Sequence, residues 1–210
     1  MFPQSFTSRN PFLYHLTAQG NIKQILCERT LLSTSSIASE VFQSLEERRT
    51  FVRDRRPTHV ILCTPNRRYT IRDQRPVSMK VLARSLTPGW TAGDFIKLLN
   101  GRVFFWPTIE RLKRHYDRYA SESPVIIRVE SEELLDLNPH VELACLNTGA
   151  TRCHPKYGGN APTRGAGTFQ PPNQIQFELR SIAEVTFPSS CVLPRKFWIG
   201  TSPEGPWQSV

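Results

Sequence analysis

Short β-prone runs, separated by helical stretches of unequal length, constrain the fold of this chain more than any other feature. The runs lie at residues 12–16, 60–63, 69–71, 103–106, 125–129 and 182–187. A doubly wound fold would show strands joined by regular helical crossovers and a glycine-rich phosphate loop, and neither pattern occurs. The sequence therefore predicts the α+β class and a single domain over residues 1–210.

Helical periodicity occupies much of the sequence between these runs. Apolar residues at helical spacing predict a helix over residues 22–28 and a long helix over residues 36–52. The sequence Thr91-Ala92-Gly93-Asp94 has the pattern of a capping box with Asp in the place of Glu, and it predicts the start of another helix.

A long segment, residues 147–181, lacks clear periodicity. Its first part, residues 147–173, contains five glycines and four prolines. A loop of this length inside a compact domain is usually functional or mobile. The run at residues 182–187 follows it and is predicted to be the last strand, ended by Pro188.

The charge of the chain is unusual in kind and in distribution. Lys and Arg total 27 against 18 Asp and Glu, and 21 of the 27 cations are arginine. Nine arginines and two aspartates lie between residues 48 and 75. Arginine pairs bidentately with phosphate and stacks on bases, so the excess favours an anionic partner such as nucleic acid. An arginine-rich genome would produce the same excess.

The cysteines and the hydropathy of the chain indicate the cellular compartment of the protein. The five cysteines are odd in number and scattered, which is typical of reduced thiols in a cytoplasm. Cys145, Cys153 and His154 lack the paired spacing of a structural zinc site, so we expect no metal. No apolar run is long enough to cross a membrane. We expect a cytoplasmic monomer that does not bind membranes.

Two ionisable residues lie in strand-like apolar runs. His15 lies within the first run, and Glu184 lies between Ala183 and Val185 in the last. An ionisable group on a half-buried strand is costly unless it is paired or used, so both are candidate site residues. Simple alternation would instead place Glu184 toward solvent between two inward-facing neighbours.

Three motifs, in order along the chain, resemble those of DarT-type ADP-ribosyltransferases and of uncharacterised bacterial proteins related to them. The motifs are Tyr14-His15-Leu16-Thr17-Ala18-Gln19-Gly20-Asn21-Ile22 continuing to Leu31-Leu32-Ser33, Phe104-Phe105-Trp106 followed by Pro107, and Ala183-Glu184-Val185-Thr186. Thr30 replaces the glycine that usually precedes the leucine pair. Together the motifs cover about a quarter of the chain.

The resemblance implies an ADP-ribosyltransferase-like split β-sandwich core with flanking helices, which binds NAD in a cleft. It implies Glu184 as the catalytic carboxylate and Arg72 as the catalytic arginine that holds NAD, with Arg75 or Arg102 as alternatives. The residues implied to contact NAD are Tyr14, His15, Thr17, Asn21, Ser33, Arg72, Phe105 and Trp106.

In this fold the loop before the glutamate strand selects the acceptor, so the resemblance assigns that role to residues 147–181. The candidate acceptor-binding residues are Arg152, Lys156, Tyr157, Arg164, Phe169 and Arg180. Interleaved arginines and aromatic residues suit an unpaired base held by stacking, with its phosphates neutralised alongside. Modification of a base requires it to be out of the duplex, which favours single strands.

The function expected from the resemblance is mono-ADP-ribosylation of a nucleic acid, at a base in single-stranded DNA or RNA, by a toxin or defence effector. An antitoxin with ADP-ribose hydrolase activity would then be a partner. Two alternatives stay open from the sequence: transfer to a protein or small molecule, or NAD hydrolysis, and a nucleic-acid-binding module without turnover.

Overall fold

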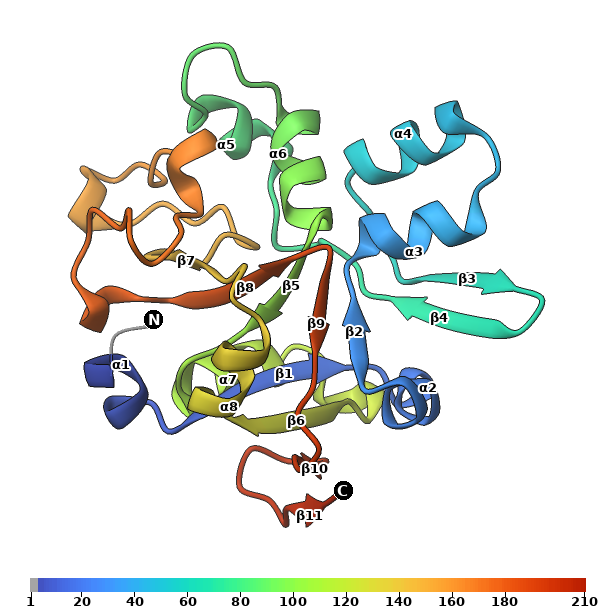
Figure 1. The fold of residues 1–210 in the computed structure, drawn as a ribbon. Helices are drawn as coiled ribbons and strands as arrows, with labels where there is room; N and C mark the ends of the chain where they lie inside the picture. Colours follow the sequence, from blue (N-terminus) through green and yellow to red (C-terminus); the bar gives the residue numbers. More distant parts are fainter. Residues whose placement is uncertain (1–3) are drawn as a thin grey trace.

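The computed structural model describes residues 4–210 as a mixture of helices and antiparallel strands (Figure 1). The α-helices are α1 (Gln4–Arg9), α2 (Ile22–Glu28), α3 (Thr34–Val41), α4 (Leu45–Arg53), α5 (Met79–Arg84), α6 (Ala92–Asn100), α7 (Ile109–Tyr116) and α8 (Ser131–Leu137). The strands are β1 (Phe12–Thr17), β2 (Thr30–Leu32), β3 (Val60–Thr64), β4 (Arg67–Ile71), β5 (Arg102–Phe105), β6 (Val125–Glu130), β7 (Glu142–Ala144), β8 (Glu184–Pro188), β9 (Ser190–Val192), β10 (Trp198–Gly200) and β11 (Gln208–Ser209).

Two of the sheets adjoin and carry most of the core. One has the strand order β1-β6-β10-β11 and the other has the order β5-β8-β7. Tyr14 and Trp106 exchange two backbone hydrogen bonds, of 3.0 and 2.8 Å, which place β1 beside the end of β5. The paired strands are antiparallel. The α+β class predicted from the sequence is confirmed.

Strand register decides which side chains enter the main core. Leu13 of β1 is opposite Val129 of β6, and Phe105 of β5 is opposite Val185 of β8. All four are buried in one cluster between the sheets and their covering helices. The hairpin β3-β4 and helix α3 enclose a smaller, separate cluster around Tyr69. Among the described residues, no helix is both long and apolar enough to cross a bilayer.

The predicted helix over residues 36–52 is wrong, because the structure divides this segment into α3 and α4. Phe42 leaves the helical conformation at φ −89° and ψ 121°, and the hydroxyl of Ser44 accepts a hydrogen bond from the backbone N–H of Glu47 at 3.4 Å. This serine cap starts a new helix. The rings of Phe42 and Phe51 lie 5.1 Å apart and hold α4 against the end of α3.

The predicted capping box is confirmed, because Thr91 and Asp94 exchange side-chain-to-backbone hydrogen bonds of 3.0 and 3.2 Å at the start of α6. The last predicted strand is only partly correct. It begins at Glu184 rather than at residue 182, it includes Pro188, and the short strands β9, β10 and β11 follow it. Residues 147–181 contain three short 3₁₀ helices and no named strand.

Candidate active site

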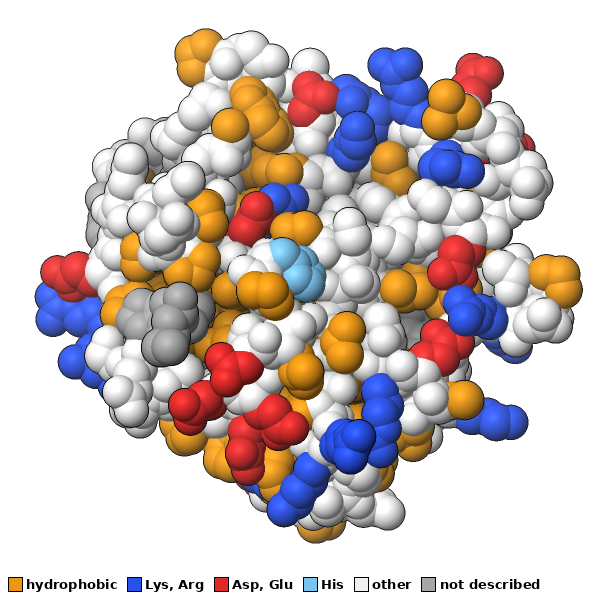
Figure 2. All heavy atoms as spheres, in the orientation of Figure 1, with side chains coloured by type: hydrophobic (Ala, Val, Ile, Leu, Met, Phe, Trp, Pro, Cys, Tyr) orange, Lys and Arg blue, Asp and Glu red, His pale blue; other side chains and the backbone are white. Residues whose placement is uncertain are grey.

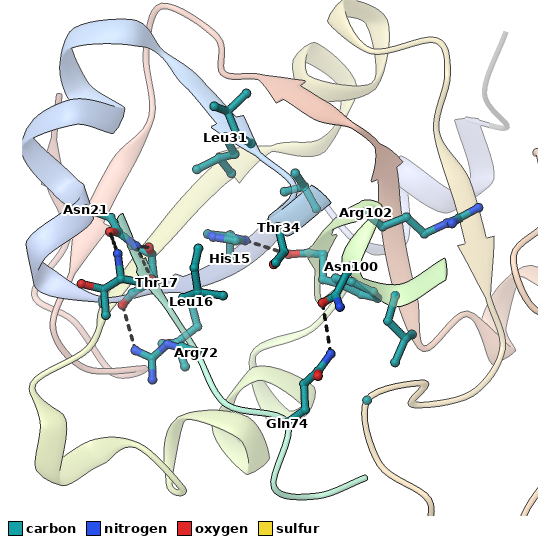
Figure 3. A pocket seen from close by; sticks show the side chains of 18 of the residues that line it. His15, Leu16, Thr17, Asn21, Leu31, Thr34, Arg72, Gln74, Asn100 and Arg102 are labelled. Atoms are coloured by element: carbon teal, nitrogen blue, oxygen red, sulfur yellow. Dashed lines mark hydrogen bonds between the residues drawn. The ribbon is translucent and has the colours of Figure 1, made fainter. Parts of the chain in front are cut away.

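A cavity of about 280 Å³ lies where β1, β4, β5 and the start of β8 approach one another. His15, Thr17, Arg72 and Glu184 are among the residues that form its wall, which we call the cavity wall. Figure 3 shows several of these side chains converging from elements that are far apart in the sequence. The volume is near the lower end of small-molecule sites, which span roughly 300–1,000 Å³.

Glu184 enters the cavity wall as the first residue of β8. It is opposite Ala144 of β7, and its exposed fraction is 3%. The backbone N–H of Thr148 donates to Oε1 at 3.1 Å, and the Thr148 hydroxyl donates to Oε2 at 2.6 Å. Alternation toward solvent is therefore wrong for this residue, because β8 is the central strand of its sheet and the loop after β7 covers its first residue.

The protonation of Glu184 is set by this environment. Burial raises the pKa of the carboxyl group from 4.5 to about 7, although the two hydrogen bonds from Thr148 and the positive charges of Arg164 and Arg111 act in the opposite direction. A carboxyl group with this pKa is divided between its protonated and ionised forms at neutral pH. Titration near the working pH is typical of a functional carboxyl group.

His15 faces the same cavity from β1. Its Nδ1 lies 2.8 Å from the carbonyl oxygen of Phe104, and because a carbonyl only accepts, Nδ1 carries the proton. Burial lowers the pKa of the imidazole to about 4, so the ring is neutral at neutral pH. Nε2 then offers a lone pair. The predicted site position of His15 agrees with the cavity geometry.

Tyr14, which precedes His15 in β1, does not face the cavity. Tyr14 points to the other face of β1, where its ring lies 6.2 Å from that of Trp207. It is outside the cavity wall. The prediction that Tyr14 contacts NAD is not supported by its position, because successive side chains of a strand face opposite sides.

The same alternation corrects the predicted aromatic wall. Phe104 and Trp106 lie in the cavity wall, whereas Phe105 between them is fully buried in the main core. The ring of Phe105 contacts that of Phe187 at a centroid distance of 5.6 Å. Trp106 therefore lies in the cavity wall and Phe105 does not. Phe104 is the aromatic residue of this wall that the motif did not identify.

Asn21 and Thr17 brace one end of the cavity. The amide nitrogen of Asn21 donates to the Thr17 hydroxyl and to the carbonyl oxygen of Thr70, both at 3.1 Å, and its amide oxygen accepts from the backbone N–H of Thr70 at 2.8 Å. Both residues line the cavity as predicted, and Asn21 fixes β1 to β4. Ser33 lies outside the wall, where its hydroxyl caps α3 by accepting from the N–H of Ser36.

Of the three candidate arginines, Arg72 fits the site best. Its NH2 donates to the carbonyl oxygen of Thr17 at 3.0 Å, and its guanidinium lies 4.3 Å from the centroid of the Tyr119 ring. Its nearest carboxylate oxygen is Oε2 of Glu122, 3.5 Å from NH1. Nε and NH1 make no hydrogen bond to any described residue.

The other two arginines are less suited to a ligand. Arg75 lies outside the cavity wall, with half of its side chain exposed, and pairs with Asp73 at 2.9 Å. Arg102 lines the wall, but its Nε donates to Glu142 at 2.8 Å and its NH1 donates to the Leu98 carbonyl oxygen at 2.9 Å. Its hydrogen-bonding capacity is therefore largely used within the protein.

The segment 147–181 differs from the predicted acceptor surface at two residues. Arg164 is 1% exposed, and its NH1 and NH2 donate to the carbonyl oxygens of Pro162 and Ala150 at 2.6 and 2.8 Å. Phe169 is buried in a core cluster. The Arg164 side chain therefore ties parts of the segment to one another. Phe169 packs the segment against the domain, so neither side chain faces an acceptor.

Of the other residues predicted to bind the acceptor, three lie on the surface and the side chain of one is not described. Arg152 and Tyr157 are exposed. Arg180 is also exposed and pairs with Glu178. The side chain of Lys156 is not among those that the structure describes.

Several residues of the cavity wall have no motif in the sequence that marks them. They include Arg56, Gln74, Asn100, Tyr119 and His115. Burial lowers the pKa of His115 to about 3, and its ring lies 4.6 Å from that of Trp106. These residues come together only through the packing of α4, α6 and α7 against the strands.

Comparison with known proteins identifies one family. Searches of curated proteins and of solved structures find no match. The model of a family described as "Family of unknown function (DUF7002)" matches residues 11–192, which include each of the motifs and the whole cavity wall. The chain belongs to this family of unknown function, DUF7002.

Proposed function

We propose that this protein is an NAD-dependent mono-ADP-ribosyltransferase with Glu184 as its catalytic carboxylate. The observation that carries the proposal is the burial of Glu184 in the cavity wall, where Thr148 orients the carboxylate with two hydrogen bonds. His15 and Arg72 share that wall. The two adjoining antiparallel sheets support an ADP-ribosyltransferase-like split β-sandwich core.

The chemistry requires a negative charge beside the sugar. Cleavage of the bond between ribose and nicotinamide develops positive charge on the ribose, as in glycoside cleavage. A carboxylate that accepts a hydrogen bond from the ribose hydroxyl interacts more strongly as that charge grows. Glu184 would act in this way, and the low dielectric around it strengthens the interaction.

The residues of the cavity wall fit the other parts of NAD. Phe104 and Trp106 offer aromatic surface for a planar ring. Arg72 has guanidinium nitrogens without hydrogen-bond partners among the described residues, which suits an anionic group. The neutral imidazole of His15 offers an acceptor for a ligand hydroxyl or amide. NAD is a co-substrate in this proposal, and no metal takes part.

We propose nucleic acid as the acceptor, at a base of single-stranded DNA or RNA. The support is the arginine excess: Figure 2 shows Lys and Arg side chains gathered over α4. Arg49 of that helix is exposed, and Arg152 and Tyr157 are exposed in the loop between β7 and β8. Such a modification would suit a toxin or defence effector whose partner is an ADP-ribose hydrolase.

Nicotinamide release tests the proposal and separates it from the alternatives. Purified protein is incubated with NAD alone, with single-stranded DNA or RNA oligonucleotides, and with bovine serum albumin as a protein acceptor. The proposal expects release that oligonucleotides increase. Release that is equal without an acceptor would support NAD hydrolysis instead. Absence of release under every condition would contradict the enzyme proposal and favour a binding module.

The pH dependence of release follows from the pKa of Glu184. Because the carboxylate must be ionised, kcat/KM should rise about tenfold per pH unit below neutrality and level off above about pH 8. The measurement is kcat/KM for nicotinamide release across about pH 5.5 to 9. A flat profile over this range would show that ionisation of Glu184 does not limit the reaction.

The substitution Thr148→Val should shift the pH profile of kcat/KM. The substitution removes the hydroxyl that donates to Oε2 of Glu184 at 2.6 Å, a bond that favours the ionised form. The midpoint of the kcat/KM profile should move to higher pH by about one unit. Thr151→Val, in the same loop but bonded to Ser78, should leave the midpoint in place. An unchanged midpoint in Thr148→Val would argue against the role of Thr148.

A further inference from the structure

Arg56 is a buried cation in the cavity wall with no carboxylate within ion-pair distance among the described residues. Its exposed fraction is 7%. Its Nε donates to the carbonyl oxygen of Arg72 at 3.2 Å and its NH2 donates to Oδ1 of Asn100 at 2.9 Å. NH1 has no hydrogen-bond partner in the described part of the chain.

This arrangement is costly unless a ligand supplies the missing charge. A buried guanidinium is normally paired with a carboxylate, because removing a charge from water is expensive. The ring of Phe51, 5.7 Å from the guanidinium, and two neutral oxygens compensate only part of that cost. Asp73 also stabilises the charge of Arg56, but it lies beyond ion-pair distance and pairs with Arg75. Burial lowers the pKa of Arg56 to about 10, so the group stays charged at neutral pH.

A second arginine lies on the same wall. The backbone carbonyl of Arg72 accepts from Arg56, and the Arg72 side chain also has guanidinium nitrogens without hydrogen-bond partners among the described residues. Gln74 and Asn100 are joined by a hydrogen bond of 3.1 Å (Figure 3). They add polar groups beside Arg56, which donates to the same oxygen of Asn100. Although NH1 of Arg72 lies 3.5 Å from a carboxylate oxygen of Glu122, both arginines have donors without hydrogen bonds, which suits an anionic ligand group with acceptor oxygens for each.

We infer that Arg56 and Arg72 together bind the diphosphate group of a small-molecule ligand. A diphosphate carries acceptor oxygens and negative charge on two linked phosphoryl groups, so one ligand group can serve both guanidinium groups. The depth of Arg56 favours a small ligand over a nucleic-acid backbone, which would need an exposed cation. The inference deepens the proposed function, since NAD contains a diphosphate, but it does not depend on turnover.

Titration calorimetry with inorganic pyrophosphate tests the inference. Wild-type protein should bind pyrophosphate, and Arg56→Met should weaken that affinity at least about tenfold. Arg68→Met is the matched control, because it removes the same charge from an exposed position on β4, and it should change affinity less than about twofold. Failure of the wild type to bind, or equal affinity of Arg56→Met and wild type, would overturn the inference.

Gln74→Glu tests the same point with Arg56 retained. The side-chain oxygen of Gln74 accepts from the backbone N–H of Arg56 at 3.1 Å, so a carboxylate there would supply the missing counter-charge. Pyrophosphate affinity should again fall at least about tenfold. This variant decides the outcome if Arg56→Met does not fold, and unchanged affinity would overturn the inference.

Two more ligands separate the possible sources of the phosphate. ADP-ribose should compete with pyrophosphate, and a single-stranded oligothymidine should not. Competition by the oligonucleotide alone would overturn the small-molecule assignment. If pyrophosphate and ADP-ribose bind through Arg56 while NAD yields no nicotinamide, the diphosphate site stands and the transferase proposal fails.

Discussion

Replacing Glu184 with glutamine is expected to reduce nicotinamide release from NAD by about 10²–10⁴-fold. The amide keeps the size of the side chain and can still bond to Thr148, but it carries no charge to match the positive charge that develops on the ribose. The measurement is the steady-state rate at about pH 8, where the wild-type carboxyl group is ionised. Glu130→Gln, an exposed substitution on β6, should retain full activity.

The same substitution should make the folded protein more stable at alkaline pH. The folded state holds the Glu184 proton with a pKa of about 7, whereas the reference value is 4.5, so wild-type stability falls as pH rises between these values. The loss amounts to about 3 kcal/mol when complete. Glu184→Gln lacks this loss, so its free energy of unfolding should exceed that of wild type at about pH 8 and approach it near pH 5.

Chemical denaturation of both proteins at the two pH values measures this difference. Wild type and Glu184→Gln share the other titrating groups, such as His15 and His115, so the contributions of these groups to stability cancel in the comparison. A Glu184→Gln protein that keeps wild-type nicotinamide release would contradict the catalytic assignment. Equal stability differences at both pH values would contradict the buried, proton-retaining state of the carboxyl group.

Replacing Arg164 with methionine should cost about 3 kcal/mol of folding free energy. Arg164 is 1% exposed, and its loss leaves the carbonyl oxygens of Pro162 and Ala150 without these donors. An unsatisfied buried group costs about 1–3 kcal/mol. Because the same segment carries Thr148, which orients Glu184, catalysis should fall as well.

Urea denaturation measures the stability change, with nicotinamide release measured in parallel. Arg152→Met is the control, because that side chain is exposed in the same segment and its loss should change stability by no more than about 0.5 kcal/mol. Equal stability of the Arg164 and wild-type proteins would show that this arginine does not hold the segment. It would also restore the interpretation of Arg164 as an acceptor-binding residue.

The sequence predicted those residues of the site that lie in a recognisable strand run and in a motif. The strand run around His15 and the motif around Glu184 placed both residues in the same site, and the structure brings both into one cavity wall. Phe105 was assigned wrongly in place of Phe104, although strict alternation from Trp106 would have selected Phe104. The Phe104-Phe105-Trp106 motif does not itself specify which face of the strand each ring occupies.

Other features required tertiary contacts that no local pattern reveals. Arg164 and Phe169 have the composition of a surface loop, and only packing against the domain shows that they are buried. The break between α3 and α4 depends on the cap at Ser44, which competes with continuous helical periodicity. Arg56 is one of nine arginines in a basic run, and its burial beside Asn100 distinguishes it from the others only in the folded protein.

The mass of the acceptor after reaction tests the central claim most directly. Wild-type protein and Glu184→Gln are each incubated with NAD and a mixture of single-stranded DNA and RNA oligonucleotides at about pH 8, and the oligonucleotides are then examined by mass spectrometry. The account predicts the mass of one added ADP-ribose on an oligonucleotide with wild type and none with Glu184→Gln. Oligonucleotides of unchanged mass with folded, pyrophosphate-binding wild-type protein would contradict it.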